Sequence, residues 1–341
     1  MTMISSSSTP SQAQTVTRDA DGRPTRPCPV CGSERSRFYI DAPPHLLDDV
    51  DRIPDEVYAY RKCDDCRAVF IAELPSAETL SIYYDSADYH RYKRKLTGSR
   101  PDRLSPVWYA YLSVLRPIPA KPPGKHLDFG CGAGDYVVFG RSQGWDSAGI
   151  EFSEASAAEG RDRGLTVYTE AQLDAIPDGS VDLVTMNHSL EHVFDPVATL
   201  RTMAAKVRRG GMVYVEVPSL DCPDFWLFGG SFLGAPLHTQ FFDDGNMRLL
   251  GDRVGLRLEG CRNNPWMIQY FTLTFLTWLQ HRFGLRLKGS TAGLISAAMF
   301  PIMVFPALLL PVVGINGMAR RYYFRKPVAA EAGSGTTGRQ S

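Results

Sequence analysis

The sequence predicts an α/β protein: a doubly wound parallel sheet, preceded by a small cysteine-rich module and accompanied near its end by an apolar helical insertion. Three observations lead to this prediction. Short apolar runs alternate with helical segments from residue 125 onward, two Cys-x-x-Cys pairs lie before them, and residues 289–319 carry no charged side chain. A chain of 341 residues is long enough for one large and one small domain.

The overall charge is balanced, with 37 basic and 37 acidic residues. This balance argues against a strongly electrostatic nucleic-acid binder. Residues 1–26 contain a serine run and no long apolar stretch. We therefore expect a disordered tail rather than a signal peptide, and an intracellular location.

Two cysteine pairs, Cys28/Cys31 and Cys63/Cys66, each place two thiolates on one tight turn. Two such turns facing each other form the tetrahedral four-cysteine site of a structural zinc ion. Short apolar runs at 38–40, 57–60 and 69–71 predict the strands of a zinc ribbon. A redox dithiol is the alternative, but it needs only one pair.

Residues 76–116 have a helical pattern and many aromatic side chains. These side chains either pack on the main domain or form a lid over a ligand, and packing is the commoner use of an aromatic stripe. Four prolines in residues 117–124 predict a stiff linker after this region.

A glycine-rich turn follows the first predicted strand of the main sheet. The strand begins at Lys125 and reaches Asp128, the turn contains Gly130, Gly132 and Gly134, and a helix is predicted over 136–143. Glycines let backbone N–H groups approach a ligand closely, and the N-terminus of the helix adds further N–H donors. A packing role for such a turn is the alternative.

The remaining pattern alternates strands and helices. Strands are predicted at 146–152, 165–168, 181–186, 212–217 and 256–260, and helices at 154–163, 196–209 and 243–255. Ligands bind at the carboxyl ends of the strands in such sheets. Glu151 ends the second strand, 17 positions after Gly134. An acidic residue there can accept two hydrogen bonds from a ribose diol, although it could also be a solvated residue before the next helix.

Four segments in order resemble the class I S-adenosylmethionine-dependent methyltransferases, most closely the branch that modifies small molecules, quinones and sugars. They are HLDFGCGAG at 126–134, GIEFS at 149–153, IPDGSVDLV at 176–184 and LEHVFDP at 190–196. The resemblance implies a Rossmann-like, doubly wound, seven-stranded sheet. The cysteine spacing adds a small N-terminal zinc ribbon to it, and the uncharged stretch near the end adds a C-terminal apolar helical insertion. The resemblance also implies that the final strand, within 319–328, is antiparallel.

The resemblance implies residue roles as well. The cofactor would be held by Asp128 near its methionine ammonium group, by Gly130, Gly132 and Gly134 in the turn, by Glu151 at the ribose, and by Asn187 beside the sulfonium.

Methyl transfer to a hydroxyl group needs a base, and histidine suits that role near neutral pH. The candidate catalytic residues are His188, His192 and His238, with His188 favoured because it follows a strand end. The expected metal ligands are Cys28, Cys31, Cys63 and Cys66, and the expected cofactors are S-adenosylmethionine and a structural zinc ion.

The apolar stretch 289–319 is long enough to enter a membrane, but three prolines interrupt it and the final strand must return to the sheet. We therefore expect attachment to the inner face of the cell membrane by a hairpin or in-plane anchor. A hydrophobic cap over the sheet or a dimer interface is the alternative.

The predicted function is methyl transfer to a small or lipid-linked, sugar-like or quinone-like acceptor at a membrane surface. A zinc-ribbon RNA methyltransferase and a non-catalytic cofactor-binding scaffold are the alternatives. The predicted organisation of the chain is a disordered tail (1–26), zinc ribbon (27–75), helical linker or lid (76–124), cofactor-binding core (125–265), apolar helical insertion (266–318), final strand (319–328) and second disordered tail (329–341).

Overall fold

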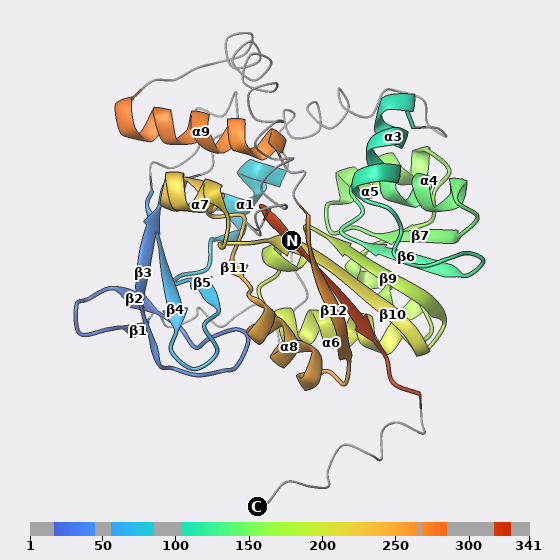
Figure 1. Ribbon diagram of the computed structural model, residues 1–341, viewed down its shortest axis with the longest axis horizontal. Coiled ribbons are helices and arrows are strands. Elements are labelled where there is room, and N and C mark those ends of the chain that lie inside the picture. The colour runs from blue at the N-terminus through green and yellow to red at the C-terminus, as the bar shows by residue number, and fades with distance from the viewer. Residues whose placement is uncertain (1–16, 45–55, 85–103, 265–267, 285–316, 329–341) are drawn as a thin grey trace, which may run out of the picture.

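A computed structural model describes residues 17–44, 56–84, 104–264, 268–284 and 317–328. Two sheets form the body of the protein, the larger on the right and the smaller on the left in Figure 1. The apolar insertion that the sequence predicts at 289–319 lies almost entirely outside the described residues, so its membrane role stays a prediction.

The large sheet has seven strands in the order β12-β13-β10-β9-β6-β7-β8. Its strands, in chain order, are β6 (Lys125–Phe129), β7 (Asp146–Ile150), β8 (Val167–Tyr168), β9 (Val181–Asn187), β10 (Val207–Pro218), β12 (Arg257–Asn264) and β13 (Ala319–Arg325). The strands from β10 to β8 pair in parallel, whereas β13 is antiparallel to both neighbours. The doubly wound seven-stranded fold and its antiparallel final strand are therefore confirmed.

Helices cover this sheet. In Figure 1, α3 (Pro106–Leu115), α4 (Asp135–Ser142) and α5 (Glu154–Asp162) gather beside β6 and β7, while α6 (Pro196–Lys206) and α8 (Asp244–Arg253) lie beside β10 and β12. The strand order reverses between β6 and β9, so the chain runs in opposite directions along the sheet after these two strands. Folds of this kind bind ligands at the carboxyl ends of the strands on either side of such a reversal.

Helix α6 begins as the sequence predicts but ends early. The Asp195 side chain caps it by accepting the N–H of Ala198, and Pro196 fills its first position. The predicted end at residue 209 was wrong, because β10 already starts at Val207, which is fully buried and pairs with Val181. Burial of Val207 in the sheet therefore outweighs continuation of the helix.

The small sheet has the order β11-β5-β4-β3. Its strands are β3 (Ser36–Ala42), β4 (Tyr58–Cys63), β5 (Val69–Ile71) and β11 (Gln240–Phe241). The first three match the predicted ribbon strands, whereas β11 comes from the segment that follows β10 of the large sheet. The small sheet is thus completed by a distant part of the chain.

Residues 17–26 belong to the folded part, which corrects the prediction of a disordered tail over 1–26. Two short strands, β1 (Thr17–Arg18) and β2 (Pro24–Thr25), pair antiparallel. The guanidinium of Arg61, 4% exposed, lies 2.6 Å from the Asp19 carboxylate between them. A buried arginine requires a charged partner, which fixes this hairpin against the small sheet.

The other helices lie near the small sheet. They are α1 (Ala77–Tyr84), α7 (Pro223–Phe228) and α9 (Ile268–Phe283). Short 3-10 turns also occur at Glu170–Ala175, which follows β8 of the large sheet, at Leu190–His192 and at Gly229–Phe232. Figure 1 shows α9 beside α7. Within the described ranges, none of the helices combines the length and apolar character that a membrane crossing requires.

Candidate functional site

The turn after β6 is shaped by three glycines in a left-handed backbone conformation. Gly130, Gly132 and Gly134 have φ angles of 73°, 57° and 89°, which residues with a Cβ atom adopt rarely. A Cβ atom on Gly130 would lie 2.5 Å from the Ser189 hydroxyl, and one on Gly134 would lie 2.3 Å from the Leu165 side chain. The sequence requires glycine here both for conformation and for space.

Asp128 lies in β6, next to this turn, and is 4% exposed. The hydroxyl of Thr185 donates to its Oδ1 at 2.6 Å, and the Asn187 amide nitrogen donates to the same atom at 3.4 Å. Burial raises the pKa of Asp128 to about 7. The side-chain amide oxygen of Asn187, Oδ1, is buried and accepts no hydrogen bond from the described residues, so it can receive a donor from a ligand.

Glu151 follows β7, the neighbour of β6, and its carboxylate reaches across to the glycine turn. Its Oε2 accepts the N–H of Gly132 at 2.7 Å, and its Oε1 accepts the N–H groups of Phe152 and Ser153, each at 2.9 Å. The structure therefore brings together Asp128, the three glycines, Glu151 and Asn187, all of which the sequence selected. Their arrangement places carboxylate, amide and backbone groups next to one another at the ends of neighbouring strands.

His188 is the first of the three selected histidines and lies just beyond β9. Its Nδ1 is 3.2 Å from Glu191 Oε1, and its Nε2 is 3.2 Å from Glu216 Oε1. Burial by itself would lower the pKa of His188, but hydrogen bonding to Glu191 and Glu216 raises it above its ordinary value. Its backbone is also left-handed, with φ of 50°. The ring therefore lies between two carboxylates, which favour its protonated form.

Glu216, near the end of β10, is a central residue that sequence reasoning missed. It is fully buried, and its carboxylate oxygens contact side chains from several separate elements: Arg116, His188, Tyr214, Asn264 and Arg321. Burial alone would raise its pKa, but Arg116, His188 and Arg321 hold the pKa of Glu216 well below its usual range. A charged residue inside a strongly apolar strand was the one signal that could have identified it.

His192 and His238 form a pair whose ring centroids are 4.8 Å apart. The Nδ1 of His192 lies 3.0 Å from the carbonyl oxygen of Leu237. A carbonyl can only accept a hydrogen bond, so Nδ1 carries the proton and the neutral ring has its lone pair on Nε2. Gly234, with φ of 64°, permits the close approach of the His238 ring, because a Cβ atom there would lie 3.1 Å from His238 Nδ1.

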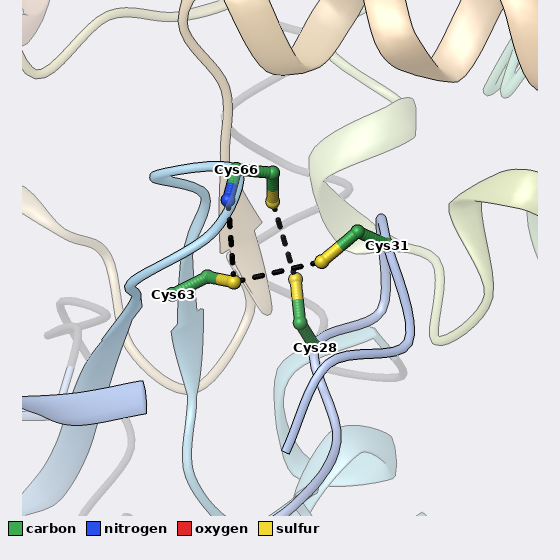
Figure 2. A group of neighbouring side chains, drawn as sticks. All are labelled: Cys28, Cys31, Cys63 and Cys66. Carbon is green, nitrogen blue, oxygen red and sulfur yellow. Dashed lines mark hydrogen bonds between the residues drawn. The ribbon is translucent and has the colours of Figure 1, made fainter. Parts of the chain in front are cut away.

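The four predicted cysteine ligands lie together. Figure 2 shows their sulfur atoms converging from two turns. The Cys28 and Cys66 sulfurs are 3.5 Å apart, as are those of Cys31 and Cys63, and all four lie within 4.8 Å of one another. A tetrahedral zinc ion with bonds of about 2.3 Å to sulfur separates its sulfurs by about 3.8 Å. The four residues therefore fit a zinc ion in number, kind and spacing.

Comparisons with known proteins agree with this geometry. The methyltransferase domain family matches residues 101–288, more than half of the chain. A ubiquinone biosynthesis O-methyltransferase of Bordetella avium is 35% identical over 168 residues, which cover 43% of this chain and 69% of that protein. A trans-aconitate 2-methyltransferase of Rhodococcus jostii is 28% identical over 117 residues, covering 33% of this chain and 46% of that protein.

Among solved structures, phosphoethanolamine N-methyltransferase 2 of Haemonchus contortus, in complex with S-adenosyl-L-methionine, has a similar fold. The TM-score is 0.50 with 15% sequence identity, and the match covers 86% of this chain and 69% of that one. The family match, the relatives and the seven-stranded sheet agree with one another. The chain belongs to the methyltransferase domain family and is a class I S-adenosylmethionine-dependent methyltransferase.

Proposed function

We propose that this enzyme methylates a hydroxyl group of a quinone-like or sugar-like acceptor, either a small molecule or a lipid-linked one. The observation that carries this proposal is the His192–His238 pair, which lies in the segments after β9 and β10. It offers a base to an acceptor in a position separate from the glycine turn. The quinone-like class is supported by the relative of 35% identity, whose name assigns it to ubiquinone biosynthesis.

The cofactor is held by the residues around the glycine turn. Glu151 accepts hydrogen bonds from the ribose hydroxyls, in place of the N–H of Gly132 that it accepts here. Asp128 and the side-chain amide oxygen of Asn187 would receive the methionine ammonium group. Gly130, Gly132 and Gly134 keep the main chain close enough for contact with the cofactor. S-adenosylmethionine supplies an electrophilic methyl group at its sulfonium.

His192 is the residue best suited to act as the base. Its Nε2 carries the lone pair of the neutral ring, because Nδ1 donates to Leu237. It would accept the proton of the acceptor hydroxyl through Nε2 as that oxygen takes up the methyl group that bound S-adenosylmethionine would supply. His188, which the sequence favoured, is less suited because both of its ring nitrogens face carboxylates, which favour the protonated ring. His238 supports the His192 ring from the side.

The four cysteines hold a structural zinc ion. Their sulfurs supply a complete tetrahedral set, so no open position is left for a reactant. Metal binding requires the cysteines as thiolates, so zinc binding at this site would release their protons. Attachment to the inner membrane face through residues 289–319 remains part of the proposal, because a lipid-linked acceptor would be presented there.

The acceptor class is tested by label transfer. The purified protein is incubated with methyl-labelled S-adenosylmethionine and, separately, with a catechol-type quinone precursor, a nucleotide-linked sugar, a bacterial membrane lipid extract and structured RNA. We expect label in at least one of the first three, reduced in the His192→Asn variant. Label found in RNA alone would contradict the proposal and favour the RNA methyltransferase alternative.

A further inference from the structure

The small cysteine-bearing sheet is joined directly to the histidine pair. Strand β11 begins two residues after His238 and pairs antiparallel with β5, with Gln240 opposite Phe70 and Phe241 opposite Val69. The N–H of Ile71 extends this ladder by donating to the Thr239 carbonyl at 2.9 Å. Strand β5 in turn begins three residues after Cys66. The backbone of β5 and β11 therefore connects the cysteine cluster to His238 of the pair.

A side-chain contact reinforces the connection. Tyr60, in β4, is fully buried, and its hydroxyl donates to the carbonyl oxygen of His238 at 2.5 Å. The Tyr60 ring also lies against Phe241, with centroids 6.0 Å apart, and Phe241 meets the His238 ring edge-to-face at 5.7 Å. The small sheet thus holds both the main chain and the ring of His238.

The opposite side of the same segment holds the loop that carries His192. The N–H of Thr239 donates to the Glu191 carbonyl at 2.8 Å, and the Gln240 side chain donates to the Val193 carbonyl at 2.6 Å. Thr239 and Gln240 are both fully buried. A buried polar group that loses its hydrogen-bond partner costs about 1–3 kcal/mol. A displacement of residues 239–240 should therefore move the loop that carries His192 with it.

We propose that the cysteine-bearing sheet is one wall of the acceptor site and that Tyr60 is a positioning residue for the His192–His238 pair. In this arrangement residues 237–241 form a shared layer, bonded to the small sheet on one side and to residues 190–193 on the other. The sheet does not act on the cofactor, whose residues lie on β6, β7 and the end of β9. The inference rests on the proposed function, because it assigns the pair to the acceptor side.

The test compares Tyr60→Phe with Tyr39→Phe. The first variant removes one hydroxyl and keeps the ring. The second makes the same change in β3, where the Tyr39 ring stacks on Phe225 and has no hydrogen bond to residues 237–241. Both variants, in the full-length metal-loaded protein, are studied by NMR of histidine side chains, by zinc content and by calorimetry with S-adenosylmethionine. Individual substitutions assign the histidine signals.

We expect Tyr60→Phe to shift the His238 and His192 ring signals and to lower kcat roughly tenfold, as small misplacements of reacting groups do. Zinc content and S-adenosylmethionine affinity should stay within twofold, and Tyr39→Phe should match the wild type in all readouts. Unchanged histidine signals in a folded, zinc-loaded Tyr60→Phe protein would overturn the inference. The NMR signals test the positioning role of Tyr60 even if no acceptor is methylated. Failure of this inference can therefore be distinguished from failure of the proposed function.

Discussion

The two sides of the proposed site are built in different ways. On the proposed cofactor side, Asp128, the glycine turn and Glu151 come from one continuous stretch of 24 residues that runs from the end of β6 through its neighbour β7. On the acceptor side, His192, His238 and Tyr60 come from segments far apart in the chain and meet through a two-residue strand. A cofactor site that depends on local structure should tolerate changes in the small sheet, whereas the acceptor side should not.

The largest expected effect is loss of the base. His192→Asn keeps a side-chain donor for the Leu237 carbonyl but removes Nε2, and we expect the rate of methyl transfer to fall about 10²–10⁴-fold. S-adenosylmethionine binding, measured by calorimetry, should be unchanged. His281→Asn, at an exposed position in α9, is the control and should retain the wild-type rate. An undiminished rate in His192→Asn would remove this residue from the chemistry.

Removal of one cysteine tests whether the two sides are independent. In Cys63→Ser we expect loss of bound zinc and about a 100-fold lower transfer rate, because the layer at 237–241 shifts with its sheet. Hydrogen exchange should accelerate at 58–71 and 237–241 and change little at 125–151. Cys28 and Cys63 share a core cluster with the large sheet, so equal acceleration in both regions would show that the cysteine site supports the whole fold instead.

The cofactor side is tested by Glu151→Gln. Hydrogen bonds that involve a charged group contribute about 1.5–3 kcal/mol, so we expect S-adenosylmethionine to bind roughly 10–100-fold more weakly. Zinc content and the histidine NMR signals should stay as in the wild type. Glu154→Gln is the matched control, because Glu154 is exposed and pairs with Arg161 on the surface of α5. Equal affinities in the two variants would contradict the ribose role of Glu151.

The smallest effect concerns pH, and it arises where the two sides meet. The pKa of His188 is raised in the folded state, so its stabilising contribution is complete below about 6.5, its unfolded value, and is lost as pH rises through the higher folded pKa. The depressed pKa of Glu216 means that its contribution is present above about 4.3, its unfolded value, and is lost only as pH falls through the folded pKa.

This pH dependence is measured by urea unfolding of the wild type and of His188→Gln. The difference in unfolding free energy between the two proteins should be largest on the acidic side of neutrality and should shrink as pH rises. A difference that stays constant from pH 5 to pH 9 would show that the ring is not held as a cation between Glu191 and Glu216.

Much of the cofactor side was predictable from local sequence. The glycines of the turn and the position of Glu151 at a strand end follow from the alternation of strands and helices, because parallel strands of this kind bring their carboxyl ends to one edge. The four cysteines were also predictable from local sequence, because the spacing within each pair places two thiolates on one turn. The resemblance to class I methyltransferases then named the donor.

The acceptor side was less predictable. Strand β11 has only two residues and no pattern of its own, and it exists because β5 offers a free edge. Glu216 would be read as an isolated acid in an apolar strand, and its low pKa depends on Arg116 and Arg321, which lie about 100 residues away on either side. The hairpin at 17–25 forms because Arg61 requires the Asp19 carboxylate.

The fold class, the glycine turn and the cysteine cluster are predictable from the chain alone, since each depends on residues close together in the chain or on a repeating pattern. Folding settles which histidine faces two carboxylates, which one donates to a carbonyl, and that the small sheet borders the histidine pair. Protonation and position of a buried side chain depend on the charges and donors packed around it, and these come from segments whose contact no local sequence pattern predicts.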